Sequence, residues 1–159
     1  MLVRNFKKED KKQVENIFAM YWTDQEFLKK LSDKLEMCIN QTQEYFDGKY
    51  RFFVAEKNGE IVGVAGMRSA PAHMKVYAET DNPVEFYVLA SKYKGQGIGK
   101  ALRLKRMEEA KNLNFTEIVF YSPNSHSDSW KFHDKLGFQR LGEVIAPDGE
   151  PGQIWRKVL

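Results

Sequence analysis

The sequence predicts an α/β protein built on one mixed β-sheet, with about seven strands flanked by about four helices. Three observations carry this prediction. Runs rich in β-forming residues alternate with stretches of helical apolar spacing, an Asn-Gly pair joins two of those runs, and two helical stretches each lie between strands. Hairpins give antiparallel neighbours and helical crossovers can give parallel ones, so the sheet should be mixed. At 159 residues the chain is expected to be a single domain, residues 1–159.

The N-terminal part of the chain is expected to form one strand and two helices. Leu2–Phe6 is a short strand candidate. From about Asp10 the apolar residues follow helical spacing. A second helix is predicted from about Asp24 to Phe46, and Gly48 would end it.

The pattern then changes to the period of strands. Arg51–Lys57 and Glu60–Ser69 are joined by Asn58-Gly59, a dipeptide that tolerates the positive φ of a two-residue hairpin turn. This predicts an antiparallel hairpin. Residues 70–82 have no clear period and are expected to form a loop. Pro83–Ala90 is the next predicted strand, with proline at a first position where no ladder donor is lost.

The C-terminal half alternates helices and strands before it closes on two strands joined by a Pro-Asp-Gly turn. The predicted elements are a helix from the glycine cluster to about Asn112, strand Phe115–Ser122, helix Ser127–Leu136, and strands Phe138–Ala146 and Gln153–Leu159.

Composition excludes several classes of protein. Lys plus Arg total 25 and Asp plus Glu total 22, a net charge of +3, which gives no reason to expect a nucleic-acid partner. One cysteine, Cys38, excludes an internal disulfide framework and a multi-cysteine metal site, so no metal is expected. The sequence has no apolar run of membrane-spanning length and no signal-peptide core, so we expect a cytoplasmic protein without a membrane partner.

A glycine cluster, Lys94-Gly95-Gln96-Gly97-Ile98-Gly99-Lys100, lies between the Pro83–Ala90 strand and the next helix. Glycines let backbone approach an anion closely, and a helix N-terminus offers unpaired N–H groups, so the segment suits a phosphate or diphosphate. The P-loop pattern G-x-x-x-x-G-K-S/T does not fit, because three residues separate Gly95 from Gly99 and Ala101 stands at the hydroxyl position. The Rossmann pattern G-x-G-x-x-G does not fit, because the third glycine comes one residue early.

The segment Val84–Leu102 resembles motif A of the GCN5-related N-acetyltransferase (GNAT) family, whose diphosphate loop is written Q/R-x-x-G-x-G/A. Lys94 stands at the first loop position, where it offers phosphate a cation without the two-pronged geometry of arginine. Trp130–Phe138 resembles motif B of the same family, in which an aromatic–Tyr–x–Lys–x–Gly–Phe stretch closes a helix. The order of predicted elements agrees with the family over essentially the full chain, so the resemblance implies the GNAT acyl-CoA N-acyltransferase fold.

The resemblance implies that the chain binds acetyl-CoA as its co-substrate. Motif A would cradle the CoA diphosphate, and the backbone of Val88 and Leu89 would pair with the pantetheine arm, as an added strand does. An asparagine before motif B commonly touches CoA in this family. His126 occupies that spacing here, so Asn124 or Ser127 is expected to make the contact, and Lys131 could reach the CoA phosphates. The expected CoA-binding residues are Val88, Leu89, Lys94, Gly95, Gln96, Gly97, Ile98, Gly99, Lys100, Asn124, Ser127 and Lys131.

Acetyl transfer to an amine needs a group that accepts the amine's proton and a leaving thiolate that is tolerated or protonated. Family members often carry an acidic residue on the motif A strand, which makes Glu85 the predicted base; Glu79 and Asp81 are the rival carboxylates. The family's usual acid is the tyrosine of motif B, and His133 occupies that position. A histidine has an unperturbed pKa near 6.5 and can donate a proton when charged. Tyr121 and Ser122 are the alternative acids.

Three functions compete at this stage. The first is an N-acetyltransferase that moves the acetyl group of acetyl-CoA to a primary amine of a small molecule or protein, by direct attack in a ternary complex. The alternative is a catalytically silent CoA-binding module, because tyrosine is replaced at His133. The third is a nucleotide-binding protein with a variant phosphate loop. Acidic residues within 20–47 and 70–82 could draw a cationic amine. Many family members form homodimers, but the sequence does not decide the oligomeric state.

Overall fold

The computed structural model of the chain describes residues 1–40 and 50–159. Its strands follow the order β1-β2-β3-β4-β5-β7-β6 in a seven-stranded sheet. Strands β4 and β5 are parallel, whereas β1–β2, β2–β3, β5–β7 and β6–β7 are antiparallel. The predicted mixed α/β sheet is therefore confirmed.

Contacts divide the chain into two compact units. The first comprises Met1–Ser69 and Phe86–Leu113, and the second comprises Ala70–Glu85 and Asn114–Leu159. Strand β4 (Pro83–Ser91) gives its first three residues to the second unit and the rest to the first.

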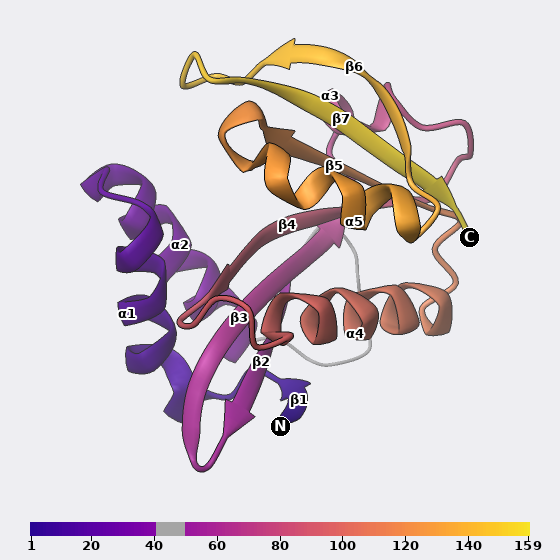
Figure 1. The fold of residues 1–159 in the computed structure, drawn as a ribbon. Coiled ribbons are helices and arrows are strands. Elements are labelled where there is room, and N and C mark those ends of the chain that lie inside the picture. Colours follow the sequence, from indigo (N-terminus) through magenta and orange to yellow (C-terminus); the bar gives the residue numbers. More distant parts are fainter. Residues whose placement is uncertain (41–49) are drawn as a thin grey trace. The chain divides into compact units, whose positions relative to one another are not determined.

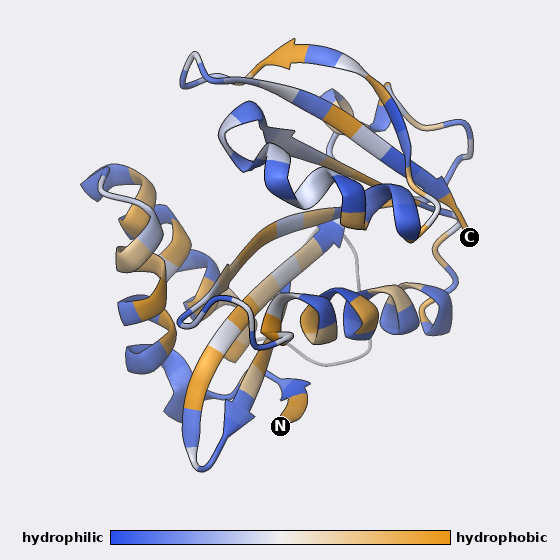
Figure 2. Cartoon of the chain, in the orientation of Figure 1, coloured by the Kyte–Doolittle hydropathy of each residue, from blue (hydrophilic) through white to orange (hydrophobic). Residues whose placement is uncertain are grey.

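In the first unit, α1 and α2 cover one face of the β1–β3 segment and α4 covers the other (Figure 1). In Figure 2, α1, α2 and α4 carry hydrophobic residues alternating with hydrophilic ones, as expected for helices with one face on a sheet. No helix in the described part of the chain is long and apolar enough to cross a membrane. The elements are β1 (Leu2–Asn5), the 3-10 helix η1 (Lys8–Asp10), α1 (Lys11–Tyr21), α2 (Gln25–Ile39), β2 (Tyr50–Lys57), β3 (Glu60–Ser69) and α4 (Ile98–Asn112).

Helix α2 begins where predicted and ends earlier. The Asp24 side chain caps its N-terminus by accepting hydrogen bonds from the N–H groups of Glu26 and Phe27. The helix ends at Ile39, where Asn40 takes a non-helical backbone conformation, with φ −93° and ψ 6°. The predicted continuation to Phe46 and the stop at Gly48 lie outside the described residues.

The β2–β3 hairpin is confirmed. Asn58 and Gly59 both have positive φ, 51° and 78°, as a hairpin turn of two left-handed residues requires. Gly63 of β3 is required by lack of space rather than by backbone conformation. A Cβ built there would lie 2.5 Å from Cγ2 of Ile98 and 2.9 Å from Cδ1 of Leu102. The missing side chain lets the start of α4 lie directly against β3.

In the second unit, the helical segments η2 and α5 contact one face of the β5–β7–β6 segment, and α3 packs against β5. Residues 124–136 differ from prediction, because the expected helix Ser127–Leu136 is a 3-10 helix followed by a short α-helix, with non-helical φ/ψ at His126. Gly137 follows α5 with φ 83°, as predicted for a residue just past a helix end. The elements are α3 (Ala72–Lys75), β5 (Glu117–Pro123), η2 (Asn124–Ser129), α5 (Trp130–Lys135), β6 (Gln139–Ile145) and β7 (Pro151–Val158).

The segment predicted as a loop, residues 70–82, contains the one-turn helix α3. Its Met74 is 4% exposed and packs with Val119 and Ile154, so one buried side chain fixes a stretch that has no apolar period of its own. Glu117, which is fully buried, fixes the end of the same segment. Its carboxylate accepts hydrogen bonds from the N–H groups of Glu79 and Thr80 and from the Thr80 hydroxyl, each at 2.8 Å. The loop prediction was therefore wrong for residues 72–75.

Candidate functional site

The loop that follows β4 is exposed from Lys92 to Gly97 and contains two left-handed glycines. Gly95 has φ 74° and Gly97 has φ 76°. A Cβ built on either residue would meet no atom of residues 1–40 or 50–159 within 4 Å. Backbone conformation, rather than lack of space, therefore demands glycine here, and the space beside the loop is open.

Gly97 is the N-cap of α4, a helix of 15 residues. The first N–H groups of such a helix have no partner within the helix, and no side-chain cap occupies this end. Lys94 and Lys100 are both exposed and stand on either side of the glycines. Backbone donors, the positive end of the helix dipole and two cations thus meet at one loop, the chemistry that suits a diphosphate.

Contacts with neighbouring strands and α1 hold the start of this loop. The Glu60 carboxylate, at the start of β3, accepts hydrogen bonds from Lys92 Nζ and, at 3.1 Å, from the Tyr93 hydroxyl. These two donors hold the pKa of Glu60 below its usual value. The N–H of Lys92 donates to the Val62 carbonyl at 2.7 Å, and the Tyr21 hydroxyl donates to the Ser91 carbonyl at 2.8 Å.

Strand β4 bends at Val88, whose φ of 25° is exceptional for a β-branched residue. Tyr87 and Val88 are consecutive, yet both pack against the same hydrophobic cluster of the first unit. In a regular strand, successive side chains point to opposite faces, so this packing marks a bulge-like irregularity. Holding such a backbone conformation costs about 1–3 kcal/mol, which other contacts must offset.

A cluster of cations and tyrosines surrounds the side chain of Tyr87 in the first unit. Lys34 of α2 donates to the Tyr87 hydroxyl, and its Nζ lies 4.4 Å from the centre of the Tyr87 ring. Arg68 of β3 donates to the Tyr50 hydroxyl and also lies over both rings. Sequence reasoning did not identify this cluster, because its members come from four elements and share no local motif.

The predicted base, Glu85, is 7% exposed and lies opposite Val119 in the parallel β4–β5 pair. Its rival Glu79 is engaged elsewhere in the second unit, since its carboxylate pairs with Arg156. Asp81, the other rival, is exposed. The role of Glu85 as a base stays a prediction.

The predicted acid, His133, is 1% exposed and lies among aromatic side chains. The centre of its ring is 4.9 Å from the ring centres of both Phe120 and Trp155, in edge-on geometry. Its Nε2 lies 3.3 Å from the Ser129 hydroxyl. The imidazole is thus a packed member of the second unit's core, and proton donation by it stays a prediction.

The alternative acids have partners of their own. The Tyr121 hydroxyl donates to the Glu150 carbonyl at 2.7 Å, and burial, together with the charges of Glu150 and Asp148, raises its pKa above the usual value. The Ser122 hydroxyl accepts a hydrogen bond from the Trp130 indole N–H at 3.3 Å.

The three predicted CoA contacts around motif B lie on η2 and α5. Ser127 and Lys131 are exposed, whereas Asn124 is half-buried. The Asn124 amide nitrogen donates to Glu143 at 3.5 Å, while its amide oxygen is buried and has no hydrogen-bond partner in the described ranges. The structure therefore collects the predicted contacts Val88–Lys100 in the first unit and the other predicted site residues, Glu85 included, in the second.

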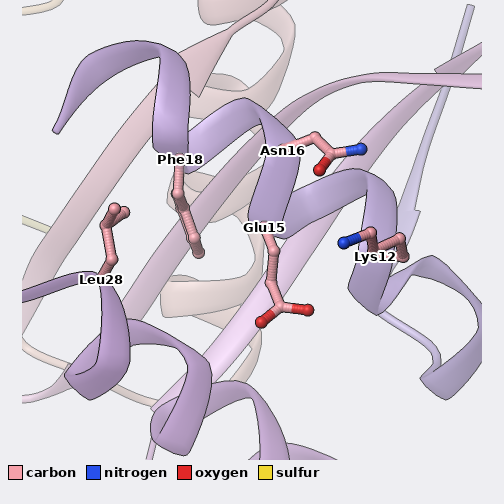
Figure 3. A pocket seen from close by; sticks show the side chains of 5 residues that line it. All are labelled: Lys12, Glu15, Asn16, Phe18 and Leu28. Atoms are coloured by element: carbon pink, nitrogen blue, oxygen red, sulfur yellow. The ribbon is translucent and has the colours of Figure 1, made fainter. Parts of the chain in front are cut away.

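A pocket of about 230 Å³ lies elsewhere in the first unit, on α1 and α2 (Figure 3). Lys12, Glu15 and Asn16 line one side of it, and Phe18 and Leu28 the other. None of these five residues belongs to the predicted site.

Comparison with known proteins places the chain in a family. Residues 12–138 match the family described as "Acetyltransferase (GNAT) family". The chain is 27% identical over 107 residues to rat N-acetyltransferase family 8 member 2, an alignment that covers 66% of this chain and 46% of the relative. It is 32% identical over 95 residues to zebrafish (Danio rerio) N-acetylaspartate synthetase, covering 58% of this chain and 31% of the relative. The chain thus spans half the length or less of these curated relatives.

The fold is shared with solved structures of low sequence identity. A structure of an aminoglycoside 6'-N-acetyltransferase complexed with coenzyme A superposes with a TM-score of 0.72 at 15% identity, covering 99% of this chain and 97% of that one. At that identity the likeness shows the fold. Because the family match covers most of the chain, this protein belongs to the GNAT acetyltransferase family.

Proposed function

We propose that the protein is an acetyl-CoA-dependent N-acetyltransferase, which transfers the acetyl group to a primary amine of a small molecule or protein by direct attack in a ternary complex. The observation that carries this proposal is the loop before α4, with left-handed backbone at Gly95 and Gly97, in a chain of the GNAT family. The spacing of the glycines excludes the P-loop and Rossmann patterns as alternatives.

The loop's geometry fits the diphosphate of CoA. Its backbone turns twice through left-handed glycines, it meets the N-terminus of a long helix, and the space next to both glycines is open. The N–H groups of Gly95 to Lys100 would donate to phosphate oxygens, and Lys94 and Lys100 would add cationic charge. The neighbour of known structure that is complexed with coenzyme A shares this fold.

The rest of the CoA molecule would contact β4 and the motif B region. The irregular backbone at Val88 and Leu89 would pair with the pantetheine arm through main-chain groups. Asn124 carries a buried amide oxygen that lacks a partner within the described ranges, which fits a ligand donor group. Ser127 and Lys131 are exposed polar residues in the same segment and complete the proposed set.

Bound acetyl-CoA supplies an activated acetyl thioester. The acceptor must attack as a neutral amine, although a lysine-like amine has a pKa of about 10.4 and is mostly charged at pH 7. We assign Glu85 to accept this proton, directly or through water, because it is an acidic residue enclosed in the motif A strand. A backbone N–H at the Val88 bend would stabilise the developing oxyanion. We assign His133 to donate a proton to the leaving CoA thiolate. This contribution is modest, because a thiolate leaves readily without protonation.

The proposed acceptor is a primary amine of a small molecule or protein. The names of the relatives and neighbours cover an amino-acid product and an aminoglycoside, so they do not converge on one substrate. A cationic acceptor could be drawn by the acids predicted within residues 20–47 and 70–82, of which 41–47 lie outside the described residues. Several of these acids already have partners, whereas Asp81 is exposed. Asp24 caps α2, Glu36 pairs with Lys11 at 2.9 Å, and Glu79 pairs with Arg156.

The test is direct. Purified protein should show a raised melting temperature with CoA or acetyl-CoA, because a ligand that binds only the folded state stabilises it. Thiol release should then be measured with a panel of amines, from free amino acids to polyamines, aminoglycosides and peptides. Binding without turnover for every acceptor would favour the catalytically silent CoA-binding module, and displacement of CoA by ATP at comparable concentration would favour a nucleotide-binding protein. No thermal shift with either CoA form would end the proposal.

A further inference from the structure

A buried arginine of α4 binds the backbone of β4 at its bend. Nη1 of Arg106 donates to the carbonyl of Gly66 in β3 at 2.8 Å, and to the carbonyls of Tyr87 and Val88 at 3.2 and 3.3 Å. Its guanidinium carbon lies 4.3 Å from the centre of the Phe86 ring. The side chain is 2% exposed, so these contacts form inside the first unit.

The two β4 carbonyls belong to consecutive residues. In a regular strand, consecutive carbonyls point to opposite edges, so one donor cannot bind both. At this bend it can, because Val88 takes a left-handed φ of 25° that turns its peptide group. The contact of Arg106 therefore depends on the bend, and by the same geometry the contact stabilises the bend.

The environment of residue 106 is unfavourable for a cation. Burial, and the nearby charge of Arg103, lower the pKa of Arg106 well below its usual value. Its Nε is also buried without a hydrogen-bond partner in the part of the chain that the structure describes. An apolar side chain of similar size would fill the interface between helix and sheet without that penalty. Packing alone therefore does not account for a guanidinium at residue 106.

We propose that Arg106 is a positioning residue, which holds the Val88 bend in the conformation that presents main-chain groups of Val88 and Leu89 to the pantetheine arm of CoA. This rests on the proposed CoA-binding function and adds a residue to it. Arg106 does not touch the ligand. It acts through the carbonyls of Tyr87 and Val88, whereas the diphosphate loop before α4 is built without it.

Two ligands distinguish the binding of the pantetheine arm from the binding of the diphosphate. ADP carries a diphosphate and lacks the pantetheine arm, whereas CoA carries both. In Arg106→Met, which keeps side-chain length and removes the donors, we expect the Kd for CoA measured by calorimetry to rise about tenfold. The Kd for ADP should stay within about twofold of the wild-type value, because the loop is unchanged.

A second substitution tests the bend itself. Glycine takes positive φ without steric cost, so a glycine at position 88 should reduce the need for the arginine. Adding Val88→Gly to Arg106→Met should recover about threefold of the lost CoA affinity. A purely structural role for Arg106 predicts no such recovery, because Val88→Gly removes packing and would only add to the damage.

Circular dichroism and the melting temperature report whether each variant folds. If Arg106→Met does not fold, Arg106→Lys takes its place in both measurements, since the ammonium keeps the charge and loses the planar set of donors. An equal loss of CoA and ADP affinity, no loss of either, or no recovery with Val88→Gly would overturn the proposal. If the wild-type protein binds neither CoA nor ADP, the proposed function itself fails, an outcome separate from those three.

Discussion

The two units hold their predicted site residues by different physical means. In the first unit the predicted site consists of backbone features: two left-handed glycines, the N-terminus of α4 and the bend at Val88. In the second unit the predicted residues would act through side chains, and one of them, His133, packs against Phe120 and Trp155. A backbone site is robust to substitution of most side chains and sensitive at glycines. A site of packed side chains is instead sensitive to substitution of those side chains. Substitutions can therefore be chosen to test each unit separately.

The largest expected effect is the loss of Trp155, which is fully buried in the second unit. Its ring stacks on Phe120 and meets His133 and Trp130 edge-on. Trp155→Ala should lower the free energy of unfolding by about 3–5 kcal/mol, through lost burial and the cavity left behind. Urea denaturation measures this loss. Trp22→Ala in the first unit is the control, and its cost should be smaller because Trp22 is only half-buried. Equal costs would mean that the aromatic packing of the second unit is not special.

The second largest effect is expected at Glu117, which organises the segment before β4. Glu117→Ala leaves the N–H groups of Glu79 and Thr80 without their acceptor, at a cost of about 1–3 kcal/mol. Glu117→Gln keeps a carbonyl acceptor in place and should recover part of the loss in urea denaturation. Hydrogen exchange should locate the change in Glu79 and Thr80. Unchanged exchange at these two amides would show that the carboxylate does not hold the segment.

Local signals in the sequence predicted the backbone features, and long-range contacts decided the rest. At Asn58-Gly59 and at the glycines 95 and 97, the residue type alone predicts positive φ, because only a few residues tolerate it. The buried Glu117 could not be predicted, since its partners lie 37 and 38 residues away along the chain. The residue type of Val88 argues against positive φ, so residue type alone does not predict the bend there. The Arg106 side chain that donates to the Val88 carbonyl lies 18 residues further along the chain.

A smaller effect on stability, with a large effect on binding, is expected at Gly97. Gly97→Val places a β-branched residue at φ 76° and should cost about 1–2 kcal/mol of stability. It should also weaken CoA binding about tenfold or more, because it distorts the proposed diphosphate loop.

Gly149→Val is the matched control in the second unit. Gly149 has φ 87° in the β6–β7 turn, and a Cβ there would also meet no atom of the described residues within 4 Å. The two variants should therefore lose similar stability, whereas CoA affinity, measured by calorimetry below both melting temperatures, should fall only in Gly97→Val. A similar fall in both would assign the effect to stability rather than to the loop.

The smallest expected effect is a loss of stability at low pH through Asp10, at the start of α1. Here the first unit depends on a contact between side chains. Burial alone would raise the pKa of Asp10, but the two-pronged hydrogen bonds from Arg4, at 2.8 and 3.0 Å, and the Lys7 N–H hold it below its usual value. A carboxyl whose folded pKa is depressed stabilises the fold above its unfolded pKa of about 3.9, and that contribution is lost as the pH falls through the folded pKa.

Asp10→Asn removes this charge. At pH 7 it should lower the free energy of unfolding by on the order of 1 kcal/mol, and the difference from wild type should shrink as the pH falls below about 4. Arg4→Met removes the other partner, together with the contact of Arg4 with Glu56 at 3.1 Å. It should also flatten the pH dependence, and the double variant should lose less stability than the sum of the two single variants. Urea denaturation between pH 3 and 7 measures the profiles. A difference between wild type and Asp10→Asn that stays constant over this range would mean that the asparagine disturbs packing rather than an ion pair.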